Sequence, residues 1–151
     1  MIDEDVVDMP YEEAWPVKSS MEEACRMEDE TEMLESFYKS MVIMICSYCE
    51  TTLLSMLPID IQKQYKYKGN KIDSYYKAIQ EHYNIKLKSI GQLWRGKKGF
   101  IKFRNDITHG KEYDITLLTP EYLNYNLKMV KDLLRTNANI ISKHAEFINT
   151  H

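Results

Sequence analysis

The sequence has few residues that break helices and no long apolar run. Its 151 residues include only five Gly and four Pro, and 44% of them are hydrophobic, which places the chain in the globular class with a length that fits one domain. No apolar stretch reaches the roughly 18 residues that a membrane span needs. The acidic start MIDEDVVD lacks the basic and apolar parts of a signal peptide. These absences predict a cytoplasmic protein with no membrane partner.

Cysteine is scarce, and the motifs of metal and nucleotide-cofactor sites are missing. The three cysteines are an odd number, as expected for reduced thiols in the cytosol. Cys46 and Cys49 form a C-x-x-C pattern that zinc and redox sites also use, but only Cys25 remains as a further thiol and no histidine lies nearby. We therefore interpret Cys46 and Cys49 as helical core residues. With no Walker loop, no dinucleotide fingerprint and no His, Cys or Asp cluster, no metal and no cofactor is predicted.

The net charge of −3 conceals an uneven distribution. Residues 1–32 contain twelve acidic and two basic residues, whereas the remainder contains 18 basic and 11 acidic residues. Between Lys86 and Lys111, eight basic residues accompany a single acid, Asp106. A surface of this kind can bind a polyanion in spite of the low overall pI. The candidate RNA-binding residues in this window are Arg95, Lys97, Lys98, Lys102 and Lys111.

Residues 1–20 are predicted to form an acidic flexible arm, followed by a helical domain over residues 21–151. The arm carries Pro10 and Pro16 and shows no sustained hydrophobic period. One interpretation is that it mimics RNA or covers the basic face. The other is a solvated tail, which is what acidic runs usually form and which we favour.

Hydrophobic spacing predicts helices along the rest of the chain. The first runs from about residue 20 to 57 and ends before Pro58; short or moderate helices follow over 59–67, 70–82 and 89–109. Gly96 and Gly99 predict a kink or loop within the fourth of these. Thr119 and Pro120 predict the start of a last helix, which continues to about residue 148. No strand pattern is found, so the fold class is an all-α bundle of four to five helices. The apolar stripe expected on the first helix consists of Leu34, Phe37, Met41, Ile45, Tyr48, Thr52 and Met56.

The segment FIKFRNDITHG, residues 100–110, carries the candidate catalytic residues. Arg104 offers a planar fork of donors suited to phosphate, and His109 can take or give a proton near neutral pH. Asn105 and His109 are four residues apart and share a helix face. Arg104 and His109 are five apart, about 140° around the axis. Either the helix loosens at its last turn, which Gly110 would favour, or a second copy of the chain completes the site.

The motif RNDITHG resembles the signature of the HEPN (higher eukaryotes and prokaryotes nucleotide-binding) superfamily. The family pattern is an arginine with a polar residue after it and a histidine beyond a spacer of four to six residues, and it is matched by Arg104, Asn105 and His109. The resemblance implies a small helical domain, a two-fold homodimer with a composite active site, and an RNase of a toxin–antitoxin or phage-defence system. It also implies a possible antitoxin or defence partner protein. HEPN domains often place an acid beside the motif, and Glu50 is the candidate, although an exposed helical glutamate is the simpler expectation.

The expected activity is therefore a metal-independent endoribonuclease. The ribose 2′-hydroxyl would attack the adjacent phosphate, leaving a 2′,3′-cyclic phosphate and a 5′-hydroxyl, with His109 in a proton-transfer role and Arg104 and Asn105 at the phosphate. The alternative is a non-catalytic helical interaction or nucleotide-binding module within a larger complex. In that case Arg104 would pair with an acid such as Glu50, and His109 would be an ordinary cation at a helix C-terminus.

Overall fold

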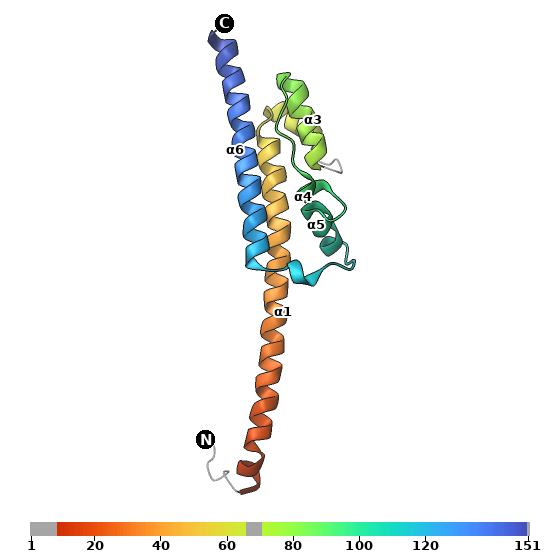
Figure 1. Cartoon of the computed structure of the whole chain (residues 1–151), viewed down its shortest axis with the longest axis vertical. Helices are drawn as coiled ribbons and strands as arrows, with labels where there is room; N and C mark the ends of the chain where they lie inside the picture. Colours follow the sequence, from red (N-terminus) through yellow and green to blue (C-terminus); the bar gives the residue numbers. More distant parts are fainter. Residues whose placement is uncertain (1–8, 66–70, 151) are drawn as a thin grey trace. The chain divides into compact units, whose positions relative to one another are not determined.

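The computed structural model describes the backbone of residues 9–65 and 71–150, and the side chains of residues 21–65, 71–91 and 94–145. Within these ranges the chain forms helices and no strand, which confirms the predicted all-α class. Residues 1–8 of the predicted arm and Asn70, the expected cap of the third helix, lie outside the described residues. The elements, shown in Figure 1, are α1 (Met9–Ser55), α2 (Ile59–Tyr65), α3 (Lys71–Tyr83), α4 (Gln92–Arg95), α5 (Phe100–Thr108), the 3₁₀ turn η2 (Ile115–Leu117) and α6 (Pro120–Thr150).

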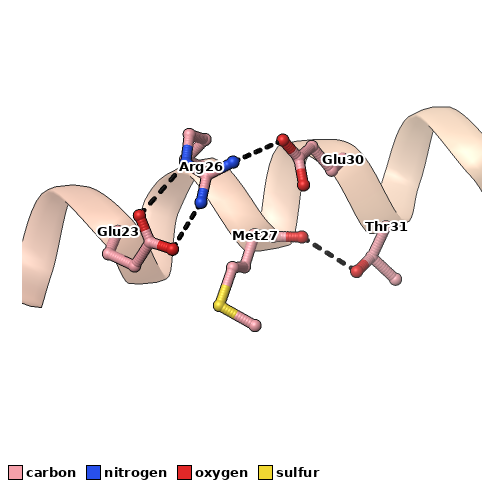
Figure 2. Close-up of polar contacts among 5 residues, drawn as sticks. All are labelled: Glu23, Arg26, Met27, Glu30 and Thr31. Carbon is pink, nitrogen blue, oxygen red and sulfur yellow. Dashed lines mark hydrogen bonds and ion pairs between the residues drawn. The ribbon is translucent and has the colours of Figure 1, made fainter.

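The chain divides into two units, residues 1–37 and 38–151. In the first unit, α1 begins at Met9, earlier than the predicted start near residue 20. Figure 2 shows Arg26 between two glutamates of this helix, where it donates to Glu23 and, over 2.7 Å, to Glu30. Pairs three and four residues apart stabilise a helix segment that buries little of its side-chain surface. This acidic segment is thus supported by its own side chains.

The second unit contains the hydrophobic core. The part of α1 from residue 38 onward runs beside α6 in the same direction (Figure 1), and residues of both helices line a shared groove, with Tyr48 and Met56 on one side and Lys131 and Ala138 on the other. Buried residues of α3, α4 and α5 complete the core. The largest fully buried apolar side chains are Trp94, Phe100, Leu53, Ile79, Val42 and Val130.

The face that α1 buries differs from the predicted stripe. Leu34, Phe37 and Tyr48 are exposed, and of the predicted stripe only Ile45 belongs to the fully buried core. The reason is that α1 has two apolar faces with the same helical spacing, so that the period alone does not select between them. The core face consists of Val42, Ile45, Cys46, Cys49 and Leu53, and Leu57, just after the end of α1, joins the same core.

Cys46 and Cys49 are buried, which confirms their interpretation as core residues. Burial raises the pKa of both thiols to about 12, because it disfavours the charged thiolate. Cys25 is exposed. The thiolate is the reactive form of cysteine, so these three residues differ in their expected reactivity.

We expect a thiol reagent at pH 8 to modify Cys25 rapidly in the folded protein and to reach Cys46 and Cys49 only after unfolding. A disulfide exchange reagent followed by absorbance measures this directly, in buffer and in guanidinium chloride. Cys25→Ser should remove the rapid phase and leave the slow one. Rapid modification of the folded Cys25→Ser protein would contradict the buried position of the other two thiols.

The helix ends follow local sequence signals. Ser55, three residues before Pro58, ends α1, and Thr119 accepts a hydrogen bond from the Tyr122 N–H over 3.2 Å at the start of α6, as predicted for a hydroxyl cap. The predicted break between residues 95 and 99 is also confirmed, since it separates α4 from α5. A side chain at Gly99 would place its Cβ 2.4 Å from the Trp94 carbonyl oxygen, so this turn requires glycine.

No described helix is both long enough and apolar enough to cross a membrane.

Asn137 of α6 holds the segment between α3 and α4 in place. Its side chain is fully buried; its Oδ1 accepts from the Lys88 N–H over 2.8 Å, and its Nδ2 donates to the Lys88 carbonyl and to Tyr76 Oη, each over 3.2 Å. Tyr76 Oη also donates to the Lys88 carbonyl over 3.1 Å. This network satisfies both main-chain polar groups of Lys88 at a partly buried position.

Asn137→Ala is expected to lower the free energy of unfolding by about 1–3 kcal/mol, because it leaves the Lys88 N–H without its acceptor, while the Lys88 carbonyl keeps the hydrogen bond from Tyr76. Urea denaturation measures the change. Asn139→Ala, an exposed site on the same helix, serves as the matched control and should change stability by less than about 0.5 kcal/mol. Equal stabilities for the two variants would show that the network is not formed.

Candidate functional site

The motif occupies α5 and its C-terminal cap. Gly110 has a φ of +67° and follows the C-cap residue His109. The Lys111 N–H donates to the Asp106 carbonyl over 2.8 Å and the Gly110 N–H to the Ile107 carbonyl over 3.3 Å, which is the hydrogen-bond pattern of a Schellman motif. Gly110 therefore occupies the predicted C′ position of the helix.

Arg104 is fixed between two acceptors. Its Nη1 donates to Glu50 Oε1 of α1 over 2.9 Å, and its Nε donates to Asn105 Oδ1, also over 2.9 Å. The side chains of Arg104 and Glu50 are only 19% and 13% exposed. The simpler expectation, an exposed Glu50, is therefore wrong, because a half-buried carboxylate needs a cationic partner and Arg104 supplies it. Lys71 Nζ lies 4.0 Å from the second oxygen of Glu50.

The ion pair lies against core residues and changes their electrostatics. Burial is the main cause of the raised pKa of Cys46, with the Arg104 charge opposing this rise and the Glu50 charge adding to it. Burial also raises the pKa of Tyr75, again with a contribution from Glu50. Because the charges of Arg104 and Glu50 act on buried residues, they lie at the edge of the apolar core. Charge interactions are screened less there than on an open surface.

His109 is exposed at the end of α5. Its backbone N–H donates to the Asn105 carbonyl over 2.9 Å, while its side chain makes no hydrogen bond or ion pair with any residue that the structure describes. The structure thus brings Arg104, Asn105 and Glu50 together in one cluster. It leaves the imidazole of His109 accessible, one helical turn from Asn105.

The basic residues around the motif differ in their partners. Arg95 pairs with Asp73 over 2.5 Å and lies 5.7 Å from the centre of the Tyr76 ring, and Lys102 pairs with Asp106 over 2.6 Å. Lys97, Lys98 and Lys111 are exposed, with no acidic partner within the described residues. Two of the five predicted RNA-binding residues therefore have their charge partly compensated. Sequence spacing could reveal the Lys102–Asp106 pair but not Asp73, which belongs to another helix.

A cavity of about 420 Å³ lies on a different face of α5 from Arg104. The sequence did not predict this cavity, because the residues after Gly110 have the pattern of an irregular connection between helices. Only their folded position against α5 creates it. Its lining residues are Lys97, Lys98, Gly99, Lys102, Phe103, Asp106, Glu112, Tyr113, Asp114 and Leu117.

Comparisons of this chain with family models, with curated proteins and with solved structures find no match. Among the described side chains, no three His, Cys, Asp or Glu residues gather as a candidate metal site. The chemistry of the α5 region must therefore be argued from the residues themselves.

We expect Glu50→Ala to lower the free energy of unfolding by about 1–3 kcal/mol, because it leaves the half-buried Arg104 without its charged partner. Glu50→Gln should cost less, since the amide oxygen still accepts a hydrogen bond. Chemical denaturation measures both variants.

The control for this pair is Asp132→Ala, which breaks an exposed ion pair with Arg135 on α6 and should cost less than about 1 kcal/mol. The double variant Glu50→Ala, Arg104→Ala should lose less stability than the sum of the two single variants, because the two residues interact directly. Strict additivity would mean that the pair does not form in solution.

Proposed function

We propose that this chain is a metal-independent endoribonuclease of the HEPN type. The observation that carries the proposal is the cluster in which Glu50 and Asn105 orient Arg104, on the same short helix that ends at the accessible imidazole of His109. A guanidinium held in one orientation is prepared to stabilise charge that develops on a phosphate. The resemblance of RNDITHG to the family motif supports the same assignment.

Arg104 keeps donors for a substrate even when it is paired. A guanidinium has five N–H donors, and Arg104 uses one on Nε and one on Nη1 for its two partners. Its Nη2 makes no contact with the described residues, and its side chain is partly exposed. The pair with Glu50 is therefore compatible with phosphate binding, and it limits the number of conformations that Arg104 can adopt.

The reaction that fits these groups is attack of a ribose 2′-hydroxyl on the adjacent phosphorus. The bond between phosphorus and the departing 5′-oxygen breaks, giving a 2′,3′-cyclic phosphate and a 5′-hydroxyl. One group removes the proton of the 2′-hydroxyl and another protonates the 5′-oxygen. His109 can serve in either proton transfer, and Arg104 neutralises the charge on the phosphate oxygens.

A single copy supplies one motif histidine, whereas the reaction uses both an acid and a base. We place the active site at a two-fold dimer in which each copy contributes Arg104 and His109. The exposed Ile43 supports an interface here, since it lies seven residues, or two turns, before Glu50 on the same face of α1. A contact at this face would bring a second motif toward the first.

The non-catalytic module remains a second candidate, favoured by one observation. Arg104 has a carboxylate partner within its own chain, as a purely structural arginine would. In that case the exposed lysines would bind a nucleic acid or a protein without cleaving it. Replacement of His109 separates the two candidates.

His109→Ala is expected to reduce cleavage of a labelled single-stranded RNA by a factor of about one hundred or more, because it removes a proton-transfer group. The assay is run with a chelator present, and the 2′,3′-cyclic phosphate ends are identified by mass spectrometry. His82→Ala, at an exposed histidine of α3, is the matched control and should cleave normally.

The same samples are examined by sedimentation equilibrium and circular dichroism, so that loss of the fold or of the dimer is not mistaken for loss of chemistry. A substrate with 2′-deoxyribose at the cleaved position should resist the enzyme. Cleavage that is unchanged in His109→Ala, or that is absent from the wild-type protein, would refute the nuclease assignment in favour of the module.

A further inference from the structure

The cavity beside α5 is lined by three lysines and three carboxylates, which differ in whether they are paired. Asp106 is paired with Lys102 over 2.6 Å, and Asp114 accepts from the Thr116 N–H over 3.0 Å and from its hydroxyl over 2.5 Å. Lys97 and Lys98 stand at the opening without an acidic partner among the described residues. One part of the cavity lining is thus cationic and available to an anion.

The other parts of the lining are aromatic and carboxylate. The rings of Phe103 and Tyr113 meet edge to face, with centres 5.9 Å apart, and Lys39 Nζ lies 5.5 Å from the centre of the Tyr113 ring. Glu112, next to Tyr113, is an exposed carboxylate that also lines the cavity. Aromatic side chains and positive charge are the combination that binds single-stranded nucleic acid.

From this lining we infer that the cavity binds one nucleotide, with its phosphate at Lys97 and Lys98, its base against the partly exposed ring of Tyr113, which the buried Phe103 supports from the core, and Glu112 accepting from a base amino group. The volume of about 420 Å³ is within the range of small-molecule sites, roughly 300–1,000 Å³. The nucleotide is either free or part of a single strand, since both present the same base and phosphate.

This site is separate from the Arg104 cluster, because Lys102, Phe103 and Asp106 lie on a different face of α5 from the side chain that contacts Glu50. Binding there needs neither His109 nor cleavage, so the inference goes beyond the proposed nuclease activity. If the chain cuts RNA, the cavity holds a base near the cut and selects among sequences. A carboxylate acceptor favours bases with an amino group, so cytosine should bind better than uracil.

The experiment is a calorimetric titration of the full chain with His109→Ala, which prevents cleavage. The probes are cytidine monophosphate, uridine monophosphate, cytidine and inorganic phosphate, followed by a short single-stranded oligocytidine. We expect cytidine monophosphate to bind at least tenfold more tightly than cytidine or inorganic phosphate alone, and more tightly than uridine monophosphate.

The double variant Lys97→Gln, Lys98→Gln should weaken binding of cytidine monophosphate about tenfold and leave that of cytidine unchanged. Glu112→Gln should remove the preference over uridine monophosphate. Lys128→Gln, an exposed lysine of α6, is the matched control and should bind normally. Circular dichroism confirms that each variant folds.

Tighter binding of the oligocytidine identifies the occupant as a strand, and binding of the monophosphate alone identifies a free nucleotide. Binding of inorganic phosphate as tight as that of cytidine monophosphate, or no saturable binding of any probe, would overturn the inference. This titration uses a variant without His109 and does not measure cleavage. Failure of the probes to bind would therefore not contradict the nuclease proposal. Failure of the chain to cleave RNA would not contradict this binding site.

Discussion

The ion pair between Glu50 and Arg104 joins the core to the candidate site. It connects α1 with α5 across 54 positions of sequence, and neither charge is more than one-fifth exposed. Each charge alone would be unfavourable at the edge of an apolar core, so each requires the other. The consequence is that Arg104 has one orientation set by the fold, with Asn105 supporting it from the same helix.

Both the Arg104 cluster and the cavity use α5, which has only nine residues. The turn that requires Gly99 begins it, and the Schellman motif at Gly110 ends it. One face contacts α1 through Arg104, while another contributes Phe103 and Lys102 to the cavity. A short helix with fixed ends can hold different chemical groups on its faces without independent motion of those groups.

The sequence predicted those features that depend on neighbouring residues. The breaks near Pro58 and Gly99, the cap at Thr119 and the C′ position of Gly110 follow from local chemistry. The prediction of which face of α1 is buried was wrong, because Val42 and Cys46 have the same helical spacing as the larger apolar residues of the predicted stripe. Contacts between distant segments, such as Glu50 with Arg104, need the folded chain. The burial of Asn137 and the presence of the cavity were missed for the same reason.

The parallel course of α1 and α6 has a consequence for how the molecule reaches its native state. Two helices that point the same way need a long return connection, and here residues 56–119, with α2 to α5, provide it. That connection is held by α6 through Asn137, 49 positions after Lys88. Such distant contacts form slowly, because the intervening chain must first lose entropy. The helix bearing Arg104 also packs against α6, since the ring centres of Phe100 and Phe103 lie 5.8 and 5.9 Å from that of Tyr122, so its native packing includes the last helix of the chain.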